Sequence, residues 1–311
     1  MKIAAIEETL REDPGDLASW LAYGDRLLEQ GDARGTLIRL EQRRARLRPA
    51  DRAAVESDIA ALVAEHRQGW DAALPPGATV LERRYGFATK VAVEWSDAAP
   101  VQIEQALRGP FVTGLRITPP PSEGDDDYRY WEDDLDDDGE PNPAGSVDTG
   151  GLATLDLGRL TELDLSYLRI GALGAKTLAV SAYLRAEAGD VETAGSRLES
   201  LDLRYSRVGN TGLAALAASP VFAGVRRLHL QRNVITEKGM PSLHRFENLT
   251  ELDLRYNEIG TDGARALLAA PFAGALKRLY LYREDVGGDG AALLAKAPQL
   301  PPALRSYWRS A

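Results

Sequence analysis

The sequence predicts an α/β solenoid, with a parallel inner sheet and outer helices, preceded by a small all-helical domain. Two observations predict this fold class. A leucine pattern of the form L-x-x-L-x-L recurs through the C-terminal part of the chain, and each copy is followed by a turn and an apolar segment. Residues 1–68, by contrast, show apolar residues at helical spacing only.

The clearest copy of the pattern is the segment 249–270, LTELDLRYNEIGTDGARALLAA. Leu252 and Leu254 alternate as in a strand, because successive side chains of a strand point to opposite faces. The second half of the segment follows helical spacing, and we expect Thr261 to cap this helix and Pro271 to end it. A single strand–turn–helix unit cannot bury its own leucines, whereas stacked copies can.

The pattern occurs in five registered copies. Its second leucine is, in turn, Leu163, Leu201, Leu228, Leu252 and Leu279. The sequence resembles leucine-rich repeats of the long, helix-containing, ribonuclease-inhibitor-like kind, which implies a curved solenoid. In such repeats an inward Asn bonds the backbone of the turn. Asn233 and Asn257 match that position, so the turns of the other copies need other hydrogen-bond partners.

The repeats begin before the first clear copy. Residues 110–117, PFVTGLRI, are similar to residues 271–279, so we place the start of the solenoid near residue 87, with degenerate first repeats. Residues 119–150 then interrupt it. Within this insertion, the segment from Ser122 to Glu140 holds eleven acidic residues and one basic residue. A segment with this composition cannot form a core, so we expect an exposed, disordered acidic loop.

The N-terminal helices resemble a second module. The residues that carry this resemblance are Asp13-Pro14, the segments 20–25 (WLAYGD), 29–32 (EQGD) and 38–40 (IRL), with His66 and Trp70. They are similar to the bacterial repeat-companion domain, which occurs at the N-terminus of repeat proteins of planctomycetes and myxobacteria. The resemblance implies no established activity. We therefore expect three parts: a helical domain at 1–68, a connector at 69–86 and the solenoid at 87–311.

Composition excludes several classes of function. The chain has no cysteine, which excludes disulfide scaffolds and thiolate metal sites and suits a reducing cytoplasm. Its net charge of −10 comes from the acidic insertion, because 36 acidic and 36 basic residues remain outside Ser122–Glu140. This balance does not indicate a nucleic-acid partner. We find no signal peptide and no membrane span, and expect a cytoplasmic protein.

Three rows of side chains on neighbouring strands are the candidate binding site. One row is Asp164, Asp202, His229, Asp253 and Tyr280; the next is Ser166, Arg204, Gln231, Arg255 and Tyr282; the third is Tyr167, Tyr205, Arg232, Tyr256 and Arg283. In these repeats such positions face the concave side. Tyr and Arg dominate protein-binding surfaces. We expect a protein or peptide to bind at Tyr167, Arg204, Tyr205, His229, Arg232, Asp253, Arg255, Tyr256, Tyr280 and Tyr282.

Other functions have weaker support. Asp134 to Glu140 matches the first half of a calcium loop, but its second half fails, because the twelfth position is Gly145. The row Asp202, His229 and Asp253 is a second candidate for a metal-regulated module. The basic cluster Arg39, Arg43, Arg44, Arg46, Arg48 and Arg52 is interpreted as a solvated face, paired in part with Glu41 and Asp51. We expect no enzyme and no cofactor, and the sequence does not predict an oligomeric state.

Overall fold

The computed structural model describes residues 3–120, 150–181 and 197–310. The chain forms two compact units, residues 1–93 with 101–113, and residues 94–100 with 114–311. Most of the insertion 119–150, including the calcium-like segment, lies outside the described residues, so its predicted disorder stays a prediction. No helix in the described ranges is long and apolar enough to cross a membrane.

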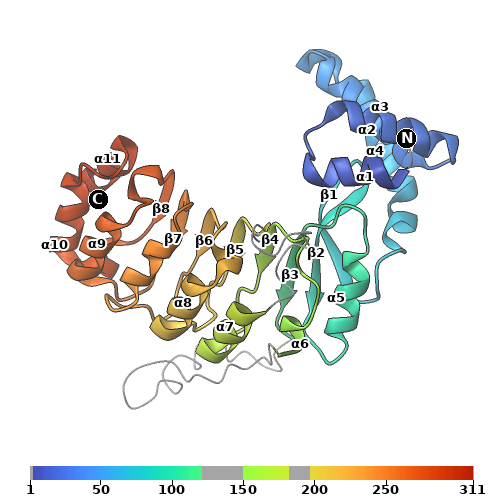
Figure 1. The fold of residues 1–311 in the computed structure, drawn as a ribbon. Helices are drawn as coiled ribbons and strands as arrows, with labels where there is room; N and C mark the ends of the chain where they lie inside the picture. Colours follow the sequence, from blue (N-terminus) through green and yellow to red (C-terminus); the bar gives the residue numbers. More distant parts are fainter. Residues whose placement is uncertain (1–2, 121–149, 182–196, 311) are drawn as a thin grey trace. The chain divides into compact units, whose positions relative to one another are not determined.

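The first unit opens with helices, as the apolar spacing of residues 1–68 predicts (Figure 1). They are α1 (Ile3–Glu12), α2 (Leu17–Glu29), α3 (Ala33–Arg46) and α4 (Ala53–Asp71), with the 3-10 turn η1 (Pro49–Asp51) between the last two. Asp16 and Asp32 cap α2 and α3, since their side chains accept hydrogen bonds from the first free backbone N–H groups. Gly35 permits α3 to approach α2 closely, because a Cβ there would lie 2.5 Å from the backbone oxygen of Gly24.

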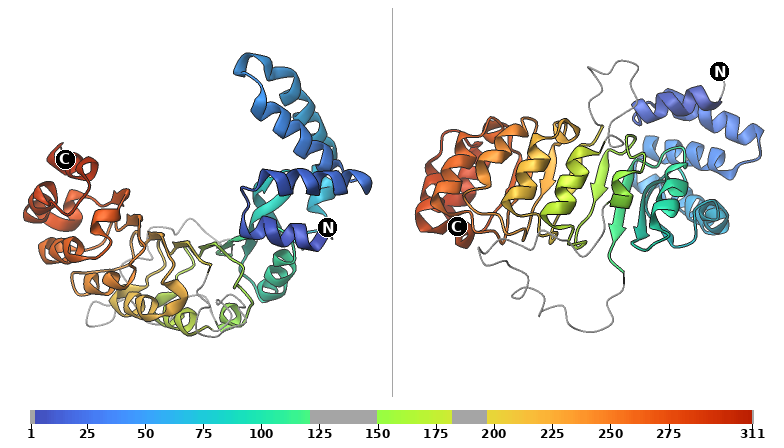
Figure 2. Two further views of the ribbon diagram at one scale, coloured as in Figure 1. Left: turned by 45° about the horizontal axis from the view of Figure 1, so that its top comes forward. Right: turned by 60° about the horizontal axis from the view of Figure 1, so that its bottom comes forward.

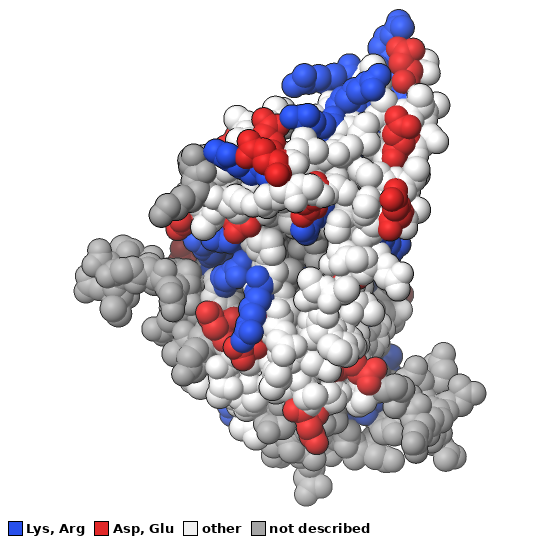
Figure 3. All heavy atoms as spheres, turned by 90° about the vertical axis from the view of Figure 1, so that its right-hand side faces the viewer, with Lys and Arg blue, Asp and Glu red and all other residues white. Residues whose placement is uncertain are grey.

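The arginines in and after α3 are paired in part with nearby carboxylates, as the sequence suggested. Arg44 of α3 lies 3.5 Å from Glu41, and Arg48, just after the helix, lies 2.9 Å from Asp51. The top of Figure 3, where α3 lies in Figure 1, shows basic side chains beside acidic ones. This mixture is typical of a solvated helix face and does not form a continuous basic patch.

A β-hairpin completes the core of the first unit. Strands β1 (Ala78–Arg84) and β2 (Phe87–Glu94) are antiparallel, and α5 (Ala99–Leu107) follows them. Residues 69–86, expected to be a connector, thus contain the end of α4 and all of β1. The Pro75-Pro76-Gly77 segment leads directly into this strand. Hairpin and helices share one core cluster: Ile6, Leu10, Trp20, Tyr23, Leu27, Ile38, Phe87 and Phe111.

The second unit contains the parallel ladder of the solenoid. Its strands are β3 (Gly114–Thr118), β4 (Glu162–Asp164), β5 (Ser200–Asp202), β6 (Arg227–His229), β7 (Glu251–Asp253) and β8 (Arg278–Tyr280). Leu163, Leu201, Leu228, Leu252 and Leu279 are paired in register along the ladder. Leu115 of β3 pairs with Leu163, which confirms the early repeat at 110–117.

Helices cover the outer side of this ladder, while the strands line the inner side (Figure 2). The α-helices are α6 (Gly150–Ala153), α7 (Gly171–Val180), α8 (Gly209–Ala218), α9 (Gly260–Ala269), α10 (Arg283–Lys296) and α11 (Pro302–Ser310). The 3-10 segments are η4 (Pro220–Phe222), η5 (Met240–Arg245) and η6 (Ala273–Ala275). The shortest repeat carries η5 in place of an α-helix, and Pro241 stands at its start, where a proline is tolerated.

Side chains close the turns that follow the strands. Asn257 donates to the Leu230 oxygen at 2.8 Å and accepts from the backbone N–H of Ile235 at 3.0 Å. In one of the three repeats that lack the Asn, the Ser206 hydroxyl donates to the Leu165 oxygen at 2.9 Å, so it is one of the expected other partners. The expectation that Thr261 caps α9 is wrong. The helix begins one residue earlier, at Gly260, whose φ of 62° suits glycine.

The first prediction concerns the stacked leucines. Leu252 is fully buried between neighbouring strands, so Leu252→Ala should lower the free energy of unfolding by about 2–5 kcal/mol. Leu173→Ala is the matched control, because Leu173 is 57% exposed on α7, and it should cost less than about 0.5 kcal/mol. Urea denaturation of both variants measures the difference. Equal losses would show that burial of the leucine row does not hold the ladder together.

Candidate functional site

The three rows lie on the strands and turns of the inner side. In each strand the leucine is buried and its neighbours at one residue on either side point to the opposite face, as alternation requires. The aspartates of the first row are themselves nearly buried: Asp164 is 5%, Asp202 8% and Asp253 3% exposed. Each accepts a hydrogen bond from the backbone N–H two residues later, at 3.0–3.1 Å. The aspartates therefore help to shape the turn that follows each strand.

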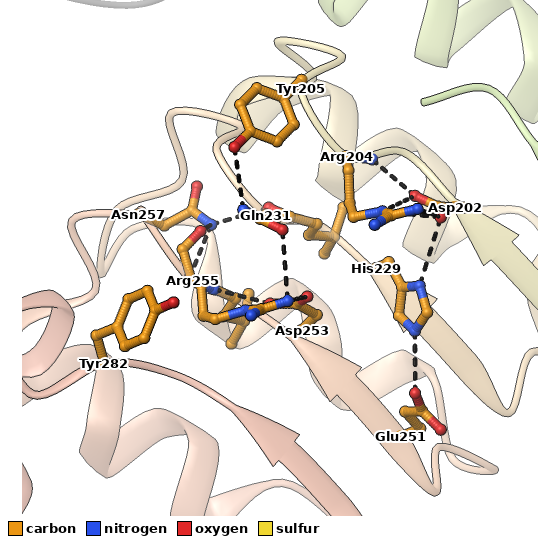
Figure 4. Close-up of polar contacts among 12 residues, drawn as sticks. Asp202, Arg204, Tyr205, His229, Gln231, Glu251, Asp253, Arg255, Asn257 and Tyr282 are labelled. Carbon is orange, nitrogen blue, oxygen red and sulfur yellow. Dashed lines mark hydrogen bonds and ion pairs between the residues drawn. The ribbon is translucent and has the colours of Figure 1, made fainter. Parts of the chain in front are cut away.

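Arginines two residues further on, in the turns that follow the strands, neutralise two of these aspartates. Arg204 donates from Nε to both oxygens of Asp202 at 2.9 Å. Arg255 binds Asp253 through Nε at 3.0 Å and through Nη2 at 2.6 Å (Figure 4). These bidentate pairs are geometrically specific and raise the pKa of both arginines.

His229 connects three strands. Its Nδ1 lies 3.5 Å from Asp202 on β5, and its Nε2 lies 3.2 Å from Glu251 on β7. Glu251 in turn pairs with Arg278 on β8 at 3.0 Å. Burial lowers the pKa of His229, but the contacts with the two carboxylates outweigh it and raise this pKa overall. Burial also raises the pKa of Asp202, whereas the bonds from His229 and Arg204 bring it down to about 2.

We call the charged side chains just described the polar ladder: Asp202, Arg204, His229, Glu251, Asp253 and Arg255. An aromatic row follows this polar ladder at the ends of the strands. We use this name for Tyr167, Tyr205, Arg232, Tyr256, Tyr280 and Tyr282. Tyr167 and Tyr205 stack with their ring centroids 4.6 Å apart, and Tyr256 and Tyr282 meet edge to face at 5.1 Å. The Arg232 guanidinium lies 6.0 Å from the Tyr205 ring. Tyr167 is 46% exposed and Tyr256 51%, so aromatic surface is what this edge presents to solvent.

Gln231 joins the polar ladder to the aromatic row. Its Nε2 donates to the Tyr205 hydroxyl at 3.1 Å, and its Oε1 accepts from Arg255 at 3.4 Å. Arg255 also lies 5.2 Å from the Tyr280 ring and 5.9 Å from the Tyr282 ring. The backbone adds rigidity, because Tyr167, Tyr205, Arg232 and Tyr256 all have positive φ values between 54° and 66°. Such conformations persist only where the surrounding structure holds them.

The structure brings together all ten residues expected at the site, on β4 to β8 and the turns that follow these strands. Sequence reasoning missed Glu251 as a member of the network. It stands two residues before Asp253 and therefore on the same face, so extending the first row by one strand step would have found it. The candidate metal row of Asp202, His229 and Asp253 is not arranged as a metal site in the described residues, and Asp253 is bound to Arg255.

Within the ranges that the structure describes, no group of three or more His, Asp or Glu side chains is arranged to hold a metal ion. Residues 197–217 and 247–268 match the leucine-rich repeat family. No curated protein matches the chain. The match supports a leucine-rich repeat protein and covers the repeats that contain β5 and β7.

The second prediction concerns His229 and pH. Because folding raises its pKa above the unfolded value of about 6.5, the stability that protonated His229 contributes is complete below that pH. It is lost as the pH rises through the folded-state pKa. The free energy of unfolding of the wild type should therefore fall above pH ~6.5 relative to that of His229→Gln.

The difference between the two proteins in urea denaturation, measured across this pH range, isolates His229 from His66 and His244. A pH-independent difference would contradict the proposed bridge between Asp202 and Glu251.

Proposed function

We propose that the protein is a non-catalytic interaction scaffold that binds a protein or peptide on the inner, concave face of its repeats. Leucine-rich repeats generally mediate protein–protein interactions, and the repeat match supports that coarse reading here. The observation that carries the finer proposal is the aromatic row: exposed tyrosines with Arg232 among them, held on a rigid ladder.

Because the arginines of the ladder are already in ion pairs, the tyrosines are favoured as the main contacts with a partner. Arg204 and Arg255 already bind the aspartates of their own strands, so a partner that used these groups would have to break strong bidentate pairs. A partner can contact the exposed rings of Tyr167, Tyr256 and Tyr280 without breaking an ion pair of this kind. Large aromatic side chains supply contact area at low cost in conformational entropy, which is lower still where neighbours already hold them.

The identity of the N-terminal domain, the bacterial source and the cytoplasmic location are further proposals. We propose that residues 1–68 are a repeat-companion domain in a bacterial, cytoplasmic protein that binds no nucleic acid. The resemblance is supported by packing, since its Trp20 and Tyr23 are buried in the core cluster. The alternative function, a calcium- or metal-regulated module, depends on Asp134 to Glu140, outside the described residues, or on the Asp202–His229 row.

The third prediction tests the aromatic row. Tyr167→Ala and Tyr256→Ala should each weaken binding of a captured partner by more than about 1 kcal/mol, because exposed Tyr anchors of a rigid surface dominate binding energy. Isothermal titration calorimetry with the purified partner gives the affinity. Tyr307→Ala is the matched control, since Tyr307 is 53% exposed on α11, away from the row.

Arg43→Ala, on α3, is a second control and should leave the affinity unchanged. An affinity that responds to Arg43 and not to Tyr167 or Tyr256 would move the binding site to the N-terminal helices. A parallel loss of binding and of thermal stability in the tyrosine variants would show that the row is structural.

A further inference from the structure

A cavity of about 450 Å³ lies within the first unit, apart from the repeat ladder. Helices α1 and α2 contribute Leu10, Arg11 and Trp20 to its walls, and the hairpin contributes Glu82, Arg84 and Thr89. Its volume falls in the range of small-molecule pockets, about 300–1,000 Å³. Its walls combine an apolar floor of two rings, tilted by 51° to each other, with cationic groups.

Two aromatic rings form the apolar floor. Trp20 and Phe111 are 1% and 5% exposed, with their ring centroids 4.9 Å apart. The indole N–H of Trp20 donates to the Pro14 oxygen at 2.9 Å, so it has no hydrogen bond left to offer a ligand. These two side chains can therefore contribute only apolar and aromatic contact to a bound molecule.

The arginines of the cavity differ in how they are partnered. Arg83 already has partners, because it pairs with Asp71 and donates to the Gly86 oxygen. Arg84 instead lies over rings, 5.4 Å from Trp20 and 5.5 Å from Tyr85. Across the described part of the chain, neither Arg84 nor Arg11 makes an ion pair with a carboxylate. Two guanidinium groups that lack anionic partners thus line the same cavity as the aromatic floor.

The net charge of the cavity indicates which charge a bound ligand would need. Arg83 and Asp71 cancel, and Glu82 offsets one of the two remaining arginines, so the cavity carries an excess of one positive charge. A monoanion balances this excess, whereas a phosphate group, with about −1.5 to −2 charges at neutral pH, overshoots it. A guanidinium fork matches a carboxylate with two parallel hydrogen bonds.

We propose that this cavity binds a monocarboxylate attached to an aromatic ring. The carboxylate is held by Arg84 and Arg11, and the ring packs against Trp20 and Phe111. Two sources share this chemistry: a free aromatic acid, and the C-terminal residue of a polypeptide that ends in an aromatic side chain. The site is independent of the scaffold function proposed for the repeats, because all its residues belong to the first unit.

The test is calorimetric titration of the full chain with 3-phenylpropionate. Its neutral isostere 3-phenylpropionamide lacks the charge, acetate lacks the ring, and phenyl phosphate carries the larger charge. The tripeptide Ala-Ala-Phe with an acetylated N-terminus, as the free acid and as the C-terminal amide, represents the polypeptide source. We expect saturable binding of one 3-phenylpropionate per chain, and at least tenfold weaker binding of the amide and of acetate.

Variants then assign the carboxylate contact. Arg84→Gln and Arg11→Gln should each weaken binding of 3-phenylpropionate by roughly tenfold, as expected for loss of a hydrogen bond between charged groups. Arg43→Gln, an exposed arginine of α3, is the matched control and should bind as the wild type does. Thermal unfolding checks that each variant folds, and the neutral-isostere comparison on the wild type needs no variant at all.

The relative affinities of the probes distinguish the two sources of the ligand. Tighter binding of the free-acid tripeptide than of 3-phenylpropionate identifies a polypeptide C-terminus as the source, and the reverse order identifies a small aromatic acid. Equal binding of the acid and its neutral amide, stronger binding of phenyl phosphate, or no saturable binding of any probe would overturn the proposal. None of these results depends on Tyr167 or Tyr256, so a failure here leaves the proposed scaffold function untouched.

Discussion

Burial of one leucine row on each strand is the constraint on which the rest of the second unit depends. Leu163, Leu201, Leu228, Leu252 and Leu279 lie in register, and each is at most 7% exposed. Because side chains alternate along a strand, a slip of one residue would exchange the buried and the inner-facing sets. The polar ladder and the aromatic row therefore owe their place to the packing of the leucines behind them.

The charges of the ladder show why aspartate suits the position after three of these leucines. An aspartate there accepts from the backbone N–H two residues later and is nearly buried. A buried charge is costly unless it is paired. Arg204 and Arg255 supply that pairing to Asp202 and Asp253 from the turns that follow β5 and β7. The ladder is thus electrostatically self-contained, and this leaves the tyrosines as its outward surface.

Sequence periodicity predicted most of the second unit, since the leucine register follows from alternation, and the resemblance to leucine-rich repeats implied the inner position of the three rows. It failed where the decisive interaction is between residues distant in sequence. Strand β1 was missed because its partner β2 and the core ring Phe111 only become neighbours in the fold. Glu251 was missed because its significance comes from His229 on the adjacent strand. The cap expected at Thr261 failed because α9 already begins at Gly260, with Ile259 at the cap position and no side-chain hydrogen bond there.

The arginines of the two units illustrate how burial of the neighbouring carboxylate, rather than spacing alone, decides what a guanidinium can do. In the repeats, the sequence Asp-x-Arg brings the two side chains together, and the pair Asp202–Arg204 is satisfied within its own repeat. In the hairpin, Arg84 stands two residues after Glu82, also an Asp/Glu-x-Arg spacing, yet it turns to Trp20 and Tyr85. The difference is burial: Asp202 is 8% exposed and needs a cation, whereas Glu82 is exposed and is solvated by water. A guanidinium over aromatic rings keeps its hydrogen-bond donors available, and this availability makes the cavity of the first unit, rather than the charged ladder, the place where an anion can be recognised.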